Sequence, residues 1–250
     1  ELLKLSNAYF LRYISNWDME QESAFWYVIK DSQEDLMSYK RNHRNQIKKG
    51  LKNCIVKKVS NNIIANDGYD VYKKAFLNYV TGAILNTKDN FKKSILNSKE
   101  YDFWAVFENI EDKTGGVGKM IGYSQNIIES NSVNYSTIKF HPDYLKLYPS
   151  YALFFEMNKY YINERNFFYV NDGAKSILHD TNIQGFLIQK FKFRKSYCKL
   201  NVVYRWDVRL IVTFLYPFRS LISMFKDKRV LNKLNTLMVQ EDIRRDCNIV

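Results

Sequence analysis

The chain has 250 residues, of which 46% are hydrophobic, and a formal net charge of +12 at pH 7. This length and apolar content suffice for a sizeable buried core, which excludes disorder across the whole chain. No run of about 18 uncharged apolar residues occurs, so a transmembrane helix is not expected.

The three cysteines, Cys54, Cys198 and Cys247, are odd in number and widely spaced. They fit neither a disulfide framework nor a CxxC metal motif, which favours a reducing, cytoplasmic location. Cys198 alternates with apolar residues and is expected to be a small buried hydrophobe. The three histidines lack the spacing of a metal-ligand set, so no metal site is predicted. The sequence also contains no P-loop, no dinucleotide-binding glycine fingerprint and no nucleophile-elbow serine.

Positive charge is concentrated in two segments. Lys40–Lys58 contains eight Lys or Arg residues and no acid, and Thr181–Trp206 contains six and no acid. Such patches attract nucleic acid, phosphate-bearing cofactors or an anionic membrane surface. A solvated basic face explains the first patch equally well.

The apolar patterns predict the following elements in chain order. In the first half they indicate a strand, a helix that begins at an Asp31 or Ser32 N-cap and ends near Lys52, a second strand and two further helices: 25–30, 31–52, 54–59, 69–80 and 89–97. Three strands of an antiparallel meander follow, at 101–109, 119–128 and 133–140. After a loop come a helix with Ser150 as N-cap, a short strand, a helix capped by Asp180 or Thr181, and a last strand: 150–164, 167–170, 181–190 and 195–205.

This order predicts an α+β domain with a central mixed sheet flanked by helices. The pattern changes beyond Trp206, where LIVTFLYPF is followed by helical spacing of Leu231, Leu234 and Met238. We therefore expect a core domain over 1–206 and a helical appendage over 207–250. The appendage mixes apolar and basic residues, so it is expected to pack on the domain or on a second subunit, or to contact a membrane surface.

Two segments resemble the GNAT superfamily of N-acyltransferases. LIQKFKFRK (Leu187–Lys195) is similar to the last helix-turn-strand of that family, with Phe193 at its aromatic position. Ile188 stands where the family often carries a tyrosine that protonates the leaving thiolate. YKRNHRNQIKKGLKNCIVKKV (Tyr39–Val59) resembles the helix-strand segment of Fem-type and polysaccharide-associated acyltransferases. The resemblance implies a GNAT-like central sheet over about residues 25–205.

The resemblance also implies a donor site for acetyl-CoA or another acyl-CoA. In such enzymes two strands diverge, and the pantetheine arm bonds to the free edge of the central strand, here Val133–Phe140. The pyrophosphate binds at the N-terminus of the next helix, here within Tyr148–Ala152. The implied cofactor-binding residues are Ile138, Phe140, Lys146, Tyr148, Ser150, Tyr151, Ala152, Thr181 and Asn182. The loop LKLYPSYA departs from the family by having no glycine.

Acyl transfer to an amine requires removal of a proton from the nucleophile. His141 lies just past the central strand and Tyr144 follows it, while Asp172 and His179 flank the loop that leads into the last helix. These four residues are the candidate catalytic residues. Capping of a strand end by His141, a backbone bond from His179, and helix capping by Thr181 or Asn182 are the structural alternatives.

The predicted function is N-acyl transfer from acyl-CoA to an amine on a sugar or peptide precursor of the cell envelope or of a polysaccharide. The protein would then work in the cytoplasm or at the inner membrane surface. Aminoacyl transfer from tRNA is an alternative that would use the Lys40–Lys58 patch. A binding module that kept the fold without catalysis is another.

Overall fold

The computed structural model describes residues 3, 6–78, 84–98, 100–110, 117–177, 182–224 and 229–247. The chain divides into two compact units. Unit 1 comprises Glu1–Val28, Ala174–Phe186 and Arg194–Val250, and unit 2 comprises Ile29–Gly173 and Leu187–Phe193. The predicted boundary at residue 206 stays a prediction, and the helices beyond it belong to unit 1.

Unit 2 is built on five strands in the order β7-β6-β5-β4-β3. Their bounds are Cys54–Val59 for β3, Tyr101–Asn109 for β4, Val117–Ile128 for β5, Ser132–Phe140 for β6 and Tyr169–Ala174 for β7. The pairs β3–β4, β4–β5 and β5–β6 are antiparallel, and β6–β7 is parallel. The antiparallel meander and the mixed sheet are therefore as predicted. Strand β2 (Phe25–Lys30) runs from unit 1 into unit 2.

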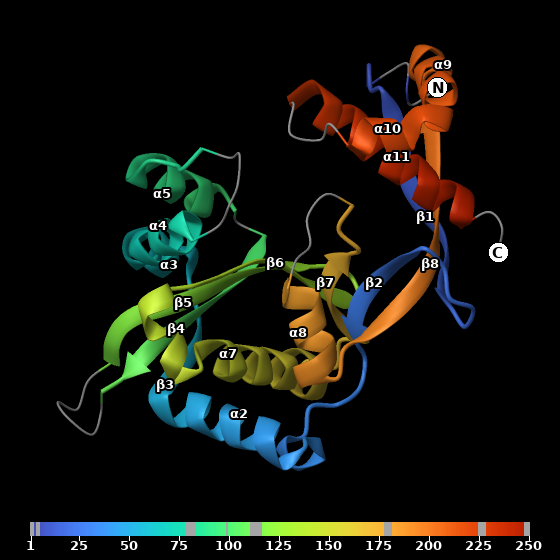
Figure 1. Ribbon diagram of the computed structural model, residues 1–250. Helices are drawn as coiled ribbons and strands as arrows, with labels where there is room; N and C mark the ends of the chain where they lie inside the picture. Colours follow the sequence, from blue (N-terminus) through green and yellow to red (C-terminus); the bar gives the residue numbers. More distant parts are fainter. Residues whose placement is uncertain are drawn as a thin grey trace. The chain divides into compact units, whose positions relative to one another are not determined.

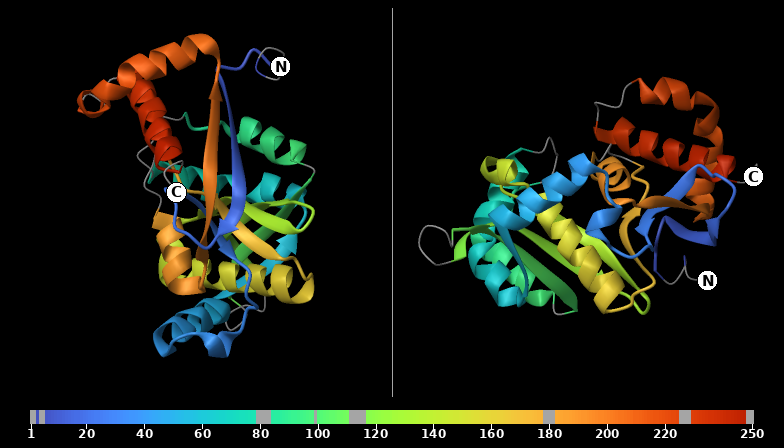
Figure 2. Two further views of the ribbon diagram at one scale, coloured as in Figure 1. Left: turned by 90° about the vertical axis from the view of Figure 1, so that its right-hand side faces the viewer. Right: turned by 90° about the horizontal axis from the view of Figure 1, so that it is seen from below.

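Helices cover both faces of this sheet (Figure 1). One face carries α3 (Asn61–Asp67), α4 (Tyr69–Leu77) and α5 (Lys88–Asn97), and the other carries α2 (Arg41–Asn53) and α7 (Pro149–Asn158). The 3-10 helices η1 (Leu36–Ser38) and η2 (Pro142–Leu147) are short, and the π-helix η3 (Lys159–Glu164) continues α7. Figure 2 shows α2 and α7 side by side.

The alternation of β4 explains why both faces are buried. Phe103 and Ala105 pack into an apolar cluster with α3, α4 and α5. Trp104 points to the opposite face, where its Nε1 donates to the hydroxyl of Tyr161 at 2.8 Å. Because successive strand residues face opposite sides, a strand covered on both sides needs large apolar groups at every position. YDFWAVFEN is apolar over Phe103–Phe107, and Phe103–Val106 is the buried part of the strand.

The N-terminal helix is shorter than predicted, because the chain from Asp31 to Glu34 is not helical. Asp35 caps the short η1 instead, by accepting from the N–H of Met37, and α2 begins at Arg41. The prediction of an Asp31 or Ser32 cap is wrong. Both the backbone and the side chain of Glu34 hold polar partners on other elements, which keeps this segment extended.

Three further predictions are corrected in unit 2. Helix α7 begins at Pro149 with Tyr148 as N-cap, so Ser150 does not cap it; the fixed φ of proline suits the first helical position. The strand predicted at 167–170 is β7, which begins at Tyr169. Helix α3 was not predicted, because its seven residues are too few to show a helical period.

Unit 1 contains a long antiparallel pair and a group of helices. Strand β1 (Phe10–Met19) pairs with β8 (Arg194–Tyr204), as Figure 2 shows. Helix α8 (Asn182–Phe191) begins in unit 1, and α9 (Trp206–Leu215), η4 (Tyr216–Phe218), α10 (Arg219–Ser223) and α11 (Arg229–Asp246) follow β8. The predicted helical character of the tail is confirmed, and Cys198 is fully buried in β8 as expected. Of the helices in the described ranges, none has the length and apolarity needed to cross a bilayer.

Candidate functional site at the end of the central strands

Strands β6 and β7 pair over only three residues and then separate. The parallel register joins Ser132 to Tyr169, Val133 to Val170 and Asn134 to Asn171. Strand β6 continues to Phe140 on its other edge against β5, whereas β7 does not follow it within the described residues. The backbone of β6 beyond Asn134 therefore has no β7 partner in the register. An edge of this kind can bond an extended ligand as an added strand would.

The separation has a local cause in the sequence Asn171-Asp172-Gly173. The Asn171 side chain donates from Nδ2 to the carbonyl of Val133 at 3.3 Å, and its Oδ1 accepts from the N–H of Gly173 at 3.0 Å. Gly173 has φ +83°, a left-handed conformation that glycine adopts without strain. Side-chain bonds thus replace the next step of the backbone ladder and turn β7 away.

Asp172 lies at the point of divergence. It follows the last paired position on β7, as Tyr135 does on β6, so the two side chains face the same side of the sheet. Burial raises the pKa of Asp172 to about 7. Burial also raises the pKa of the Tyr135 phenol well above its ordinary value, with smaller contributions from the charges of Tyr161, Glu34 and Asp172. A carboxyl group with a pKa near neutrality can exchange a proton at physiological pH.

A buried polar network includes Tyr135 on the side of the sheet that α7 covers. The Tyr135 hydroxyl donates to Oδ1 of Asn158 at 2.8 Å, and Nδ2 of Asn158 donates to Oε2 of Glu34 at 2.8 Å. Oε1 of Glu34 accepts from the hydroxyl of Tyr39 at 2.5 Å. Lys30 lies 3.9 Å from the same carboxylate, and the side chains of both charged residues are at most 1% exposed. The network ties β2, β6 and α7 together at the divergence point.

A separate cavity of about 480 Å³ lies past the end of β6. Its walls include three of the predicted residues together with charged groups from other elements: His141, Tyr144, Lys146, Asp70, Lys74 and Lys119. Asp70 pairs with Lys119 at 2.5 Å, and the hydrogen bond from Lys119 lowers the pKa of Asp70. Asp172 is not among the residues that line this cavity.

Both ring nitrogens of His141 have partners in this cavity wall. Nδ1 accepts from the N–H of Asp143 at 3.3 Å, which caps η2, and Nε2 lies 3.5 Å from Oδ2 of Asp70. The ring is 2% exposed and meets Tyr144 edge-on at 5.1 Å. The alternative that the sequence left open was capping of the strand end by His141, and the ring instead caps η2, which follows that strand.

The first turn of α7, the predicted phosphate site, has few free donors. Pro149 has no N–H, and the N–H groups of Tyr151 and Ala152 both donate to the carbonyl of Tyr148. Tyr151 is 8% exposed and Ala152 is fully buried, whereas Ser150 is half-buried. A helix N-terminus binds an anion through its unpaired N–H groups, and here that set is largely removed.

Helix α2 also occupies one side of this turn, at Gly50. A Cβ at Gly50 would lie 2.7 Å from the carbonyl oxygen of Tyr148 and 3.0 Å from the nitrogen of Ala152. Lys49 lies 5.8 Å above the Tyr148 ring. The two helices therefore meet backbone to backbone, which leaves no room for a ligand between them at this position.

We expect Gly50→Ala to destabilise the protein although alanine favours helices. The clash is with backbone atoms that cannot move aside, so overpacking of about 1–3 kcal/mol should exceed the helix-propensity gain of about 1 kcal/mol. Urea unfolding followed by circular dichroism measures the difference. Gly185→Ala on α8 is the matched control, because nothing lies within 4 Å of its added Cβ. A Gly50→Ala protein as stable as the Gly185→Ala protein would contradict the packing.

The remaining predicted residues are dispersed. Ile138 and Phe140 lie on β6 opposite Ser124 and Gly122, and the Phe140 ring packs over Gly122. Asn182 is exposed at the start of α8. His179 and Thr181 lie outside the described residues. No group of three or more potential metal ligands occurs in the ranges that the structure describes.

Sequence reasoning named Asp172 as a candidate but did not connect it with Glu34, Tyr135 or Asn158. The Asp-Gly pair directly after a strand was a usable signal, since such pairs mark turns. Glu34, Tyr135 and Asn158 gave no signal, because they lie 23 to 124 residues apart along the chain.

The mixed central sheet flanked by helices agrees with the GNAT-like fold class that the resemblance predicted. The solved structures similar to the chain include FemX and L-PGS from Bacillus licheniformis. FemX superimposes with a TM-score of 0.52 and 10% identity over 78% of this chain and 65% of FemX. L-PGS from Bacillus licheniformis superimposes with a TM-score of 0.50 and 9% identity over 87% of this chain and 69% of that protein.

The chain thus spans less than two thirds of the length of FemX. At these identities the similarity shows the fold alone. No family model and no curated protein matches the sequence.

Proposed function

We propose that this protein is an acyltransferase of the Fem type, which moves an aminoacyl group from tRNA to an amine on a cell-envelope or polysaccharide precursor. The packing of the first turn of α7 is the observation that favours tRNA over acyl-CoA as the donor. An acyl-CoA pyrophosphate needs several unpaired N–H groups at that turn, and Pro149, Tyr148 and Gly50 remove or cover them. A donor that does not rely on this turn suits the site better.

The charge of α2 supports an RNA-borne donor. Its residues Arg41, Lys48, Lys49 and Lys52 are exposed, and neither α2 nor β3 contains an acid. Phosphate contacts by such residues provide affinity for RNA without reading its sequence. The basic face that the sequence predicted on this helix is therefore available for a tRNA backbone.

In this proposal Asp172 acts as the general base. The acyl carbonyl lies along the free edge of β6 beyond Asn134, and the incoming amine approaches beside Asp172. The carboxylate takes the proton from the attacking amine, the amide bond forms as the ester bond to the tRNA breaks, and Asp172 passes the proton to the leaving tRNA oxygen, which departs as a hydroxyl. A pKa of about 7 gives the carboxylate the basicity that proton removal near neutral pH requires.

An acyl-CoA donor is the second candidate, supported by the divergence of β6 and β7. The open edge suits a pantetheine arm. Lys146 in the cavity beyond β6 would then supply the charge for the phosphates. The two candidates share the reacting edge and differ in how the donor's phosphates are held.

Binding of tRNA tests the preferred donor. Fluorescence anisotropy with labelled tRNA at several salt concentrations should give an affinity that falls with salt. Lys48→Gln/Lys52→Gln should weaken binding and lower the salt slope by about 1 per lost phosphate contact. Lys88→Gln/Lys93→Gln on α5 removes the same charge from exposed positions and is the matched control. Equal losses in the two variants would show that net charge alone attracts the RNA.

Thermal unfolding with acetyl-CoA separates the candidates. A ligand that binds the native state raises the melting temperature with its concentration. We expect no shift with acetyl-CoA up to millimolar concentration and a clear shift with aminoacyl-tRNA. A concentration-dependent shift with acetyl-CoA, abolished by Lys146→Gln, would overturn the preferred donor and support the second candidate. No shift with either donor would favour a non-catalytic binding module.

A further inference from the structure

The helices that follow β8 expose large apolar side chains, and the rings of Phe214 and Phe218 contact each other at 6.2 Å. We call this set of side chains the apolar face; its members, with their exposed fractions, are Trp206 75%, Leu210 64%, Ile211 48%, Phe214 73%, Phe218 52%, Leu221 56% and Met224 74%. Contiguous exposed apolar patches are rare on soluble proteins and mark contact with a partner or a membrane. The acyl-transfer site of unit 2 makes no use of this face.

The opposite side of the same helices is already filled. Val208 and Val212 of α9, Ile222 of α10 and Met238 of α11 form a buried cluster. At about 100° per residue, Trp206, Leu210 and Phe214 lie along one stripe of α9, and Val208 and Val212 lie along another. The apolar face is therefore a second apolar surface on these helices, not the one that folds them.

Arginines lie between the two stripes. Arg209 and Thr213 of α9 line a cavity of about 330 Å³ together with Tyr204, Arg244 and Arg245. Glu241 in the cavity wall accepts from both Arg244 and Arg245 at 2.6–2.8 Å. Three arginines against one carboxylate leave the cavity positive. Because Arg209 and Thr213 neighbour Leu210 and Phe214 in the sequence, this positive cavity borders the apolar face.

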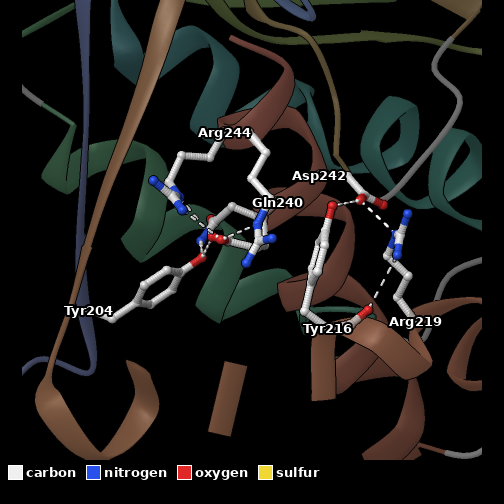
Figure 3. A network of polar contacts seen from close by, with 8 residues as sticks. Tyr204, Tyr216, Arg219, Gln240, Asp242 and Arg244 are labelled. Carbon is white, nitrogen blue, oxygen red and sulfur yellow. Dashed lines mark hydrogen bonds and ion pairs between the residues drawn. The ribbon is translucent and has the colours of Figure 1, made fainter. Parts of the chain in front are cut away.

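Glu241 holds two of the cavity arginines, Arg244 and Arg245, within a polar network. Figure 3 shows Tyr204, Gln240 and Arg244 in one cluster and Tyr216, Arg219 and Asp242 in a second. The Tyr204 hydroxyl donates to Oε2 of Glu241 at 3.1 Å, and the Tyr216 hydroxyl donates to Oδ1 of Asp242 at 2.6 Å. The cavity wall thus includes hydrogen-bonded side chains of β8 and α11 beside Arg209 and Thr213 of α9.

We propose that the apolar face docks on an anionic lipid bilayer, with a lipid phosphate bound in the arginine-lined cavity. Helices of this type lie in the membrane interface, with aromatic and aliphatic side chains in the acyl boundary and basic side chains at the phosphates. A second copy of the chain fits less well, because a symmetric contact would bring the positive cavity of one protomer against that of the other. A bilayer satisfies the apolar groups and the arginines together.

Vesicle co-sedimentation tests the proposal with the full chain. Vesicles of equal phosphatidylglycerol and phosphatidylcholine should bind the protein at least about tenfold more tightly than phosphatidylcholine alone, and salt should weaken that binding. Leu210→Gln/Phe214→Gln should reduce binding about tenfold, and Arg209→Gln should reduce the preference for the anionic vesicles. Met37→Gln/Phe168→Gln, at positions that are each 70% exposed in unit 2, is the matched control and should bind as the wild type does.

Fluorescence of Trp206 provides a second readout that needs no loss of binding. Its emission should move to shorter wavelengths on addition of anionic vesicles, and the shift should be absent in Trp206→Phe. Equal binding to both vesicle types, no binding to either, or unchanged binding of Leu210→Gln/Phe214→Gln would overturn the proposal. If the protein self-associates in sedimentation velocity and does not bind vesicles, the apolar face would instead be a contact with a second copy of the chain.

Discussion

Glu34→Ala should destabilise the protein by about 3–5 kcal/mol, because it leaves a buried cation without its counter-charge. The variant removes the acceptors for Tyr39 and Asn158 and the carboxylate that lies 3.9 Å from Lys30. Burial lowers the pKa of Lys30 and raises that of Glu34, so the ionised forms of both depend on this pairing. Urea unfolding at pH 7 measures the loss.

Two control variants isolate the cause. Glu164→Ala breaks the exposed Lys159–Glu164 pair, in which both side chains are about half exposed, and should cost at most about 1 kcal/mol. Lys30→Met/Glu34→Ala removes both buried charges and should recover part of the stability that Glu34→Ala loses. If Glu34→Ala costs no more than Glu164→Ala, the network at the divergence point contributes nothing to stability.

Asp172→Asn should abolish most acyl transfer and yet stabilise the protein above neutral pH. Removal of a general base lowers the rate by about 10²–10⁴-fold. The folded pKa of about 7 lies above the ordinary value of 3.8, so the native state holds a proton that the unfolded chain releases. The stability of the wild type therefore falls between about pH 4 and pH 7, by at most about 1.4 kcal/mol per pH unit from this group.

The stability of Asp172→Asn should not fall in this way as the pH rises. At pH 4 the two proteins should be equally stable, and at pH 8 Asp172→Asn should be the more stable by about 2–4 kcal/mol. Thermal unfolding across the pH range measures the difference, with Asp67→Asn at an exposed position as control. A wild-type profile parallel to that of Asp172→Asn would show that Asp172 ionises as an ordinary surface acid and would remove it as the base.

Asp172→Asn could lose transfer activity and yet be no more stable than the wild type at pH 8. That result would show that Asp172 contributes through its position and not as a base. The side chain would then be a positioning group near the β6 edge. The pH profile of the transfer rate distinguishes the two roles, because a general base makes the rate rise with pH through about 7.

Most strands and helices were predictable because their patterns are local, but strand β1 (Phe10–Met19) was not predicted. CIVKKV and YDFWAVFEN carry β-branched and aromatic residues in short runs, and both are strands with the predicted bounds. Helix α5 begins one residue before its predicted start, where Thr87 caps it. Strand β1 has no fully buried residue, so it lacks the alternation of buried apolar positions that marks a strand. The other errors occur where tertiary contacts override local preference, as at Glu34, or where an element is as short as α3.

The candidate site was predictable only in part. The Phe140–His141 end of the central strand and the Asp172 turn follow from the order of elements. The sequence did not predict the partner of His141, because Asp70 lies on the distant helix α4. It also did not predict that Gly50 of α2 packs against the first turn of α7. Contacts between residues far apart in sequence leave no spacing that a pattern can show.

The sequence by itself determined the α+β class, the meander, the basic helix and the helical tail, since each follows from periodicity, turn residues or charge within a short segment. The tertiary structure alone decided which polar groups share a site. It also decided how β6 and β7 separate, which side of α9 is buried and which is exposed. The physical reason is that burial and hydrogen bonding are properties of surfaces brought together by folding, and the pKa of Asp172 exists only once that burial is in place.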